Sequence, residues 1–182
     1  MRTWKRKGRG ESVRITSQLD SHEAELLASL VSSMCELLTE RADTAPRDAL
    51  SEVTGIRIGH SDAPDDATLG RLLPDFHRPD QDEELSAEVV NGRLNSALRS
   101  VNEPKIIDAK LGAAQVLLDT LPDGGGDLSL TVEQATAWLT ALNDVRLALG
   151  GRCWASPRTP PPTGCRPTIR TLRTSTSITG SP

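Results

Sequence analysis

The sequence predicts a mainly α-helical protein, a multi-helix bundle with a short N-terminal β-hairpin before it and a disordered C-terminal tail after it. Leu, Ala and Val recur at helical spacing behind clear helix-start signals. The 182 residues include one Phe, three Trp and no Tyr, so aliphatic side chains must fill the core, which favours helices over a sandwich or barrel. The composition then changes abruptly after Gly150. We therefore assign residues 1–150 to one helical domain, incomplete at its C-terminus, and residues 151–182 to the tail.

The chain begins with a basic segment that alternates about a turn. Val13 and Ile15 alternate with polar residues, and glycines at positions 8 and 10 supply the bend, which predicts a hairpin. The cations of the segment are Arg2, Lys5, Arg6, Lys7 and Arg9. Lys5, Arg6, Lys7 and Arg9 are the nucleic-acid candidates, as a basic arm. The alternative, which we favour because one such cluster is a weak signal, is a solvated hairpin whose charges discourage edge pairing.

A long helix is predicted from Asp20 to about Arg41. Asp20 and Glu23 have the spacing of a capping box. The apolar positions that follow at helical spacing are Leu27, Val31, Met34 and Leu38. Cys35 lies one turn from two of them and borders this apolar stripe.

Two short helices are predicted next, over residues 46–56 and 62–76. Pro46 fits the first turn of one, and Pro74 stops the other. A DNA-reading helix-turn-helix is the disfavoured interpretation of this pair, because its connector is longer than the usual turn. The second helix also opens with acidic residues, which phosphates would repel.

Two further helices are predicted over residues 80–101 and 102–121. Asn102 is placed as the cap of the second, with Pro104 in its first turn. A glycine-rich turn and a short extended segment at Leu128 and Leu130 follow.

The last helix of the body begins with a second capping box, Thr131 with Gln134. The predicted buried face of this helix consists of Val132, Ala135, Trp138, Leu139, Leu142 and Val145. A core role for Trp138 is favoured over a ligand platform, because Trp is highly buried on average.

No motif in the chain carries catalysis. His22, His60 and His77 are scattered without metal-ligand spacing. The glycine triplet after residue 123 lacks the Lys-Ser/Thr of a phosphate loop. We therefore expect no enzyme activity, no cofactor and no metal.

Charge and hydropathy indicate a cytoplasmic protein with a protein partner. All 25 acidic residues lie in residues 1–150, so the body repels phosphates and favours contact with proteins. No apolar run approaches the roughly 20 residues of a membrane helix, and no apolar segment of a signal peptide follows the basic start. Three unpatterned cysteines suit a reducing compartment.

The tail differs in composition from the rest of the chain. It holds six of the twelve prolines and no acidic residue. A natural disordered tail has this composition, and so does GC-rich DNA translated out of frame. Permitted codons for residues 153–160, read one base earlier, give Met-Leu-Gly-Ile-Thr-Glu-Asp-Thr, and those for residues 174–182 give His-Leu-Asp-Val-Tyr-His-Trp-Leu-Thr. The same shift across the tail restores acidic and aromatic residues, so we interpret the tail as frameshifted and exclude Cys153 and Cys165 from functional arguments.

Five segments of the body carry a resemblance to a known family. In order they are MRTWKRK, SHEAELLASLV, PRDALSEVTGI, TLGRLLPDFHRPD and LNDVRLALG. Together they resemble an actinobacterial family of helical proteins whose genes commonly lie beside that of the Clp-protease adaptor ClpS. The resemblance covers residues 1–150; the tail departs from it, whereas the shifted reading of the tail resembles the family again.

The resemblance implies a non-enzymatic transcriptional regulator. A mycobacterial branch of the family is described as an oxidative-stress transcriptional regulator that is thought to act through an RNA polymerase sigma factor. It therefore implies protein contact, with a sigma factor or RNA polymerase as the expected partner. Two alternatives stay open: an interaction module linked to Clp proteolysis, and direct DNA binding through the basic hairpin. The sequence leaves the oligomeric state undetermined.

Cys35 is the redox candidate, because it is the one cysteine of the body. A thiol sensor needs an accessible cysteine with a lowered pKa. A position in mid-helix next to Glu36 gives no such lowering, so a small core residue is the favoured interpretation of Cys35.

Overall fold

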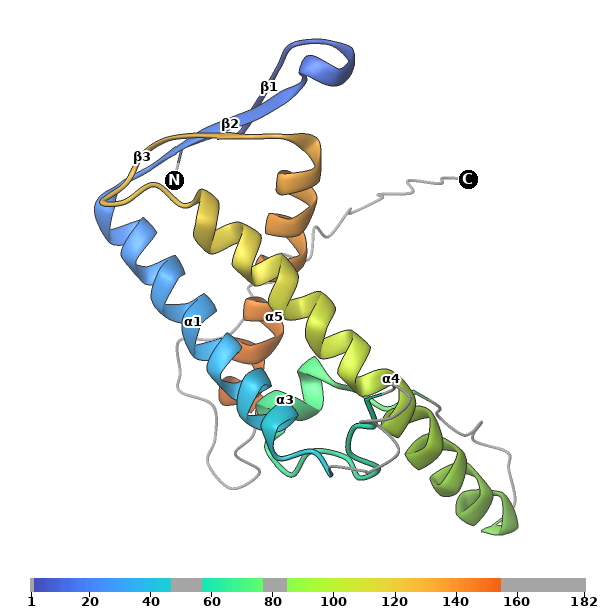
Figure 1. Cartoon of the computed structure of the whole chain (residues 1–182). Coiled ribbons are helices and arrows are strands. Elements are labelled where there is room, and N and C mark those ends of the chain that lie inside the picture. The colour runs from blue at the N-terminus through green and yellow to red at the C-terminus, as the bar shows by residue number, and fades with distance from the viewer. Residues whose placement is uncertain (1, 47–56, 77–84, 155–182) are drawn as a thin grey trace, which may run out of the picture.

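The computed structural model describes residues 2–46, 57–76 and 85–154, and it is mainly helical, as the sequence predicts (Figure 1). Its α-helices are α1 (Ser21–Asp43), α3 (Ala67–Leu72), α4 (Leu85–Thr120) and α5 (Val132–Trp154). The strands are β1 (Lys5–Lys7), β2 (Arg14–Leu19) and β3 (Gly126–Leu130). α5 packs against α1, α3 and α4, and the sheet covers the end of the bundle where α1 begins and α4 ends.

Side-chain caps define where the helices begin. The Glu23 N–H donates to Asp20 Oδ1 at 2.8 Å and the Asp20 N–H donates to Glu23 Oε2 at 3.1 Å, which confirms the capping box of α1. Thr131 and Gln134 make the same reciprocal pair at the start of α5. Asp66 caps α3 by accepting from two backbone N–H groups, at 2.9 Å each.

The predicted hairpin is part of a three-stranded antiparallel sheet with the order β1-β2-β3. β2 pairs with β1 on one side and with β3 on the other, and Ile15 lies opposite Leu130. The extended segment predicted at Leu128 and Leu130 is therefore the third strand. Since neighbouring residues of a strand point to opposite faces, Ile15, Leu128 and Leu130 share the face that packs on the helices.

A close approach of two chain segments joins the sheet to α1. Gly125 has a φ of +84°, and a Cβ at this position would lie 2.6 Å from the carbonyl carbon of Asp20. The glycine-rich turn before β3 is thus required for contact with the cap of α1.

One core connects the helices and the inner face of the sheet. Its buried members include Leu19, Val31, Met34, Leu38, Leu72, Leu73, Ile107, Ala114, Leu117, Leu128, Leu130, Trp138, Ala141 and Val145. The predicted core role of Trp138 is confirmed. Its indole N–H donates to Thr120 Oγ1 at 2.7 Å, which satisfies the one polar group of the ring.

The prediction of two helices separated at Asn102 was wrong, because α4 is continuous through Pro104. Proline has no N–H, so the carbonyl of Ser100 loses its partner within the helix. That oxygen instead accepts the N–H of Gly59 at 2.7 Å. Asn102 caps nothing: its side-chain amide donates to the Leu98 carbonyl at 2.8 Å. The other predicted helix, over residues 46–56, lies outside the described residues.

The prediction for the buried face of α5 was partly wrong. Val132 and Leu139 are 55% and 71% exposed. The residues that face the bundle are Trp138, Ala141 and Val145, at i, i+3 and i+7, so the buried stripe is rotated from the predicted one. α5 also continues to Trp154, beyond the proposed domain boundary at Gly150. Residues 155–182 lie outside the described residues.

Candidate protein-interaction surface

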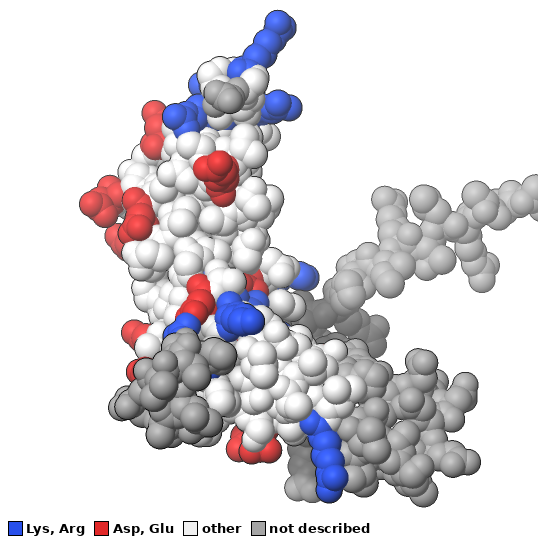
Figure 2. Space-filling model, turned by 45° about the vertical axis from the view of Figure 1, so that its right-hand side comes forward, with Lys and Arg blue, Asp and Glu red and all other residues white. Residues whose placement is uncertain are grey.

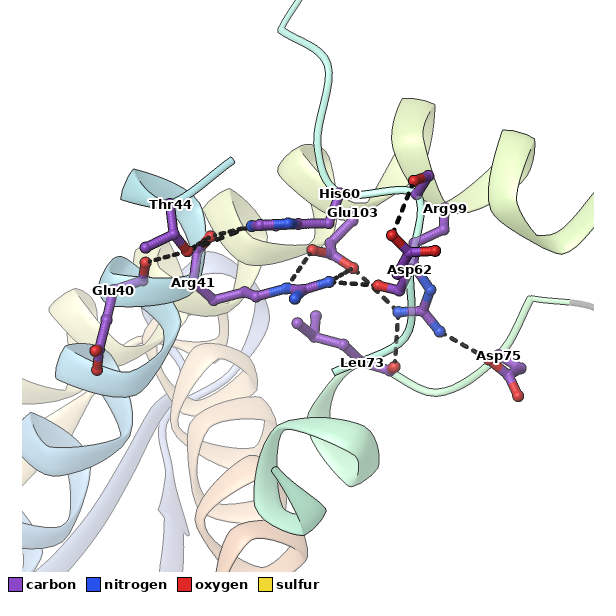
Figure 3. Close-up of polar contacts among 10 residues, drawn as sticks. Glu40, Arg41, Thr44, His60, Asp62, Leu73, Asp75, Arg99 and Glu103 are labelled. Carbon is purple, nitrogen blue, oxygen red and sulfur yellow. Dashed lines mark hydrogen bonds and ion pairs between the residues drawn. The ribbon is translucent and has the colours of Figure 1, made fainter. Parts of the chain in front are cut away.

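The strongest polar cluster of the described chain is built from buried charges (Figure 3). Arg99 and Glu103, one turn apart on α4, are each 1% exposed. Glu103 accepts from Arg99 Nη1 at 3.0 Å and, through its other oxygen, from Arg41 Nε of α1 at 2.9 Å. One carboxylate thus joins two helices through two guanidinium groups.

The same cluster holds the segments on either side of α3. Arg41 donates to the backbone carbonyl of Asp62, at 2.6 Å. Arg99 donates to the carbonyl of Leu73 at 3.1 Å and to the carboxylate of Asp75 at 2.8 Å. Because both arginines also bind Glu103, the cluster fixes α3 and its flanking segments against α1 and α4 (Figure 3).

A hollow of about 260 Å³ lies beside this cluster, between the end of α1, residues 57–60 and α4. Its polar lining includes His60, whose Nε2 lies 2.9 Å from the Arg41 carbonyl, and an ion pair between Arg57 and Asp108. Each of these polar groups already has a partner in the lining of the hollow. The hollow is therefore part of the structural cluster and offers no unpaired group among them to a ligand. No group of three or more His, Cys, Asp or Glu residues able to hold a metal occurs in the described parts of the chain.

Cys35, the redox candidate, lies half-buried on α1 and forms no disulfide. Burial raises the pKa of its thiol, and the charge of Glu36 raises that pKa further. Both effects oppose formation of the thiolate, which is the reactive species. Neither effect activates the Cys35 thiol.

The four nucleic-acid candidates are divided by the sheet. Lys5 lies opposite Thr16 and Lys7 lies opposite Arg14, on the face that points away from the helices. Arg6 lies between them in the strand and therefore belongs to the other face. Arg9 lies in the turn between β1 and β2.

An apolar groove occurs where the inner face of the sheet meets α5. It has a volume of about 320 Å³ and is lined by Trp4, Ile15, Leu130, Ala135, Trp138, Leu139 and Leu142. The floor is formed by buried core residues, whereas Leu139 on the rim is 71% exposed and Trp4 is 37% exposed. The indole N–H of Trp138 is already bonded to Thr120, so the groove offers apolar surface to whatever enters it.

Trp4 forms one wall of the groove through an aromatic contact. Its ring meets that of Trp138 edge to face, with centroids 6.0 Å apart and planes at 73°. The contact holds the start of the chain against α5. Exposed apolar side chains beside a preformed groove are typical of protein-interaction surfaces.

Fold and surface together define a helical protein with a sheet at one end and an apolar groove between them. No helix in the described residues is long and apolar enough to cross a membrane. The chain belongs to the family described as Domain of unknown function (DUF2017), whose model matches residues 1–159.

Curated relatives are close in sequence. The chain is 50% identical over 162 residues to the Oxidative stress regulator AosR of Mycobacterium tuberculosis (strain H37Rv), which covers 88% of this chain and 74% of that protein. The protein of that name from Mycobacterium bovis matches equally well. A Mycobacterium leprae relative is 47% identical over 152 residues, covering 82% of this chain and 70% of the relative. No solved structure matches the chain.

Proposed function

We propose that this chain is a non-enzymatic regulator of the oxidative-stress response, and that it acts in the cytoplasm through contact with an RNA polymerase sigma factor. The names of relatives that are 47–50% identical support the oxidative-stress role. The observation that carries the contact mechanism is the groove between Trp4 and Leu139, which holds apolar side chains open to solvent. A helix that lays an apolar side chain into such a groove is a recurring mode of recognition.

The electrostatics of the body are compatible with regulation through a protein. The acidic residues outnumber the basic ones by 25 to 21, so the net charge of the chain provides no overall attraction to DNA. A regulator of this charge can still influence transcription by binding a protein that itself contacts DNA.

The proposal is tested by titrating the full chain with the purified oxidative-stress sigma factor of the same organism, in isothermal calorimetry. We expect saturable binding with a negative heat-capacity change, the signature of apolar burial. A parallel titration with ClpS and its Clp partner examines the alternative. Binding to the Clp components without binding to the sigma factor would replace this proposal by the proteolytic one.

We also propose that residues 151–182 are translated out of frame. The composition of the tail supports the proposal, although the family model still matches the first nine residues of the tail, 151–159. The nucleotide sequence across the codon of Gly150 tests it. If the reading frame shifted by one base does not encode Leu-Gly-Ile-Thr-Glu, the proposal is overturned.

A further inference from the structure

The outer face of the sheet carries cations that the fold does not use. Lys5 and Lys7 of β1 project from this face, and in the register of the sheet Lys7 lies directly opposite Arg14 of β2. Like charges opposite each other on neighbouring strands destabilise a sheet. The arrangement therefore costs stability unless an anion lies between the cations.

These cations line one open hollow. Its volume is about 840 Å³, and its charged lining consists of Arg2, Lys5, Lys7 and Arg14 against one carboxylate, that of Asp127. The hydroxyls of Thr16 and Ser129 also line it. None of the four cations has an ion pair within the described residues. Figure 2 shows Lys and Arg side chains gathered around the tip of the hairpin, at the end of the molecule.

We propose that the outer face of the sheet binds the phosphate backbone of duplex nucleic acid. Phosphate oxygens accept from Lys, Arg, Ser and Thr, which are the donors that this face presents. The face has no aromatic side chain on which an unpaired base could stack, because Trp4 belongs to the opposite face. It also lacks the apolar centre of a protein interface. Backbone contact with a duplex is the mode that these groups fit.

The acidic body limits the strength of this binding without preventing it. Exposed charges act over about a Debye length, roughly 8 Å at physiological salt, so acids along the helices are largely screened from a duplex at the hairpin. We expect weak, sequence-independent binding with a strong dependence on salt. The inference goes beyond the proposed sigma-factor contact and does not depend on it, since the cationic face and the apolar groove lie on opposite faces of the sheet.

The test measures binding of the full chain to a labelled 25-base-pair duplex by fluorescence anisotropy between 50 and 200 mM KCl. The variant K5A/K7A/R14A removes three cations of the outer face. We expect its slope of log affinity against log salt to fall in magnitude by about 2–3, and its affinity at low salt to fall about tenfold or more. The single variant Lys5→Ala should lower the slope by about 1.

The matched control is R93A/K105A/R146A, which removes three exposed cations from the helices and changes the net charge equally. Its slope of log affinity against log salt should stay within about 0.5 of the wild-type slope. Three results would overturn the proposal: no salt-dependent binding by the wild type, an equal loss in both triple variants, or preference for polyglutamate over DNA. The last result would assign the face to an acidic protein.

Discussion

Trp4 and Trp138, 134 positions apart in the sequence, meet edge to face with ring centroids 6.0 Å apart. Trp138 is buried in the core, whereas Trp4 is partly exposed at the rim of the apolar groove. This contact joins the sheet to α5 and shapes the surface that we propose for partner binding.

Removing the Trp4 ring should destabilise the fold and also remove one wall of the groove. We expect Trp4→Ala to lower the free energy of unfolding by about 1–2 kcal/mol, less than for a fully buried Trp because the ring is partly exposed. Urea denaturation followed by circular dichroism measures the change. Trp4→Phe, which keeps an aromatic edge at this position, should recover at least half of the loss. Equal stability of Trp4→Ala and wild type would show that the contact contributes nothing.

Gly59 should tolerate no side chain. A Cβ at this position would lie 2.8 Å from Cδ of Pro104, so we expect Gly59→Ala to destabilise the protein by about 1–3 kcal/mol through overpacking. The control is Gly70→Ala on α3, where no heavy atom outside the neighbouring backbone of the helix lies within 4 Å of the new Cβ. That change should be neutral or stabilising by up to about 1 kcal/mol.

The effects of Gly59→Ala and Pro104→Ala on stability should be coupled. Pro104→Ala removes the ring that Gly59→Ala would strike, so the double variant should lose less stability than the sum of the two single variants. A double-mutant cycle by urea denaturation measures this coupling. Additive losses would mean that the cost of Gly59→Ala arises elsewhere.

The buried carboxylate of Glu103 should be essential to the fold. Glu103→Gln keeps the shape but removes the negative charge that Arg99 and Arg41 share, and we expect a loss of about 3–5 kcal/mol. Asp108→Asn, which breaks an exposed ion pair with Arg57, should cost less than about 1 kcal/mol. Thermal and urea unfolding compare the two variants. Similar losses in both would contradict the structural role of the buried cluster.

Cys35 should react slowly with electrophiles at neutral pH. Burial and Glu36 raise its pKa above the ordinary value of 9.0, so the thiolate fraction at pH 7 is smaller than in a free cysteine and still increases above pH 9. Iodoacetamide labelling followed by mass spectrometry, in a C153S/C165S background, measures the rate against pH. Glu36→Gln should lower the pKa and speed labelling at pH 8. Rapid labelling at pH 6–7 would instead support a sensor role for Cys35.

The local signals of the sequence predicted the helix starts at Asp20 and Thr131 because capping boxes depend on neighbouring residues alone. The continuity of α4 could not be predicted in this way. Pro104 is accommodated inside a helix because Gly59, distant in the sequence, supplies the missing donor to Ser100. Such compensation depends on tertiary structure.

The groove was missed for a related reason. Periodicity placed Leu139 on an apolar stripe, and an apolar stripe on a helix is most simply interpreted as core. The structure shows that the bundle covers only the neighbouring stripe through Trp138. The predicted apolar face of α5 contains more residues than the bundle buries, and this surplus was the available signal for the groove. The pairing of Lys7 with Arg14 likewise required the register of the sheet, which sequence alternation did not supply.

The central claim is that the groove beside Leu139 binds the protein partner. The most direct measurement compares the affinity of the sigma factor for wild type, Leu139→Glu and Leu26→Glu, by calorimetry on the full chain. Leu26 is 60% exposed on α1 and is not part of the groove lining, so it is the matched control. We expect Leu139→Glu to weaken binding about thirtyfold or more, as for loss of an interface hot spot, and Leu26→Glu to leave it within about threefold. Unchanged affinity of Leu139→Glu, with the fold intact by circular dichroism, would contradict the account.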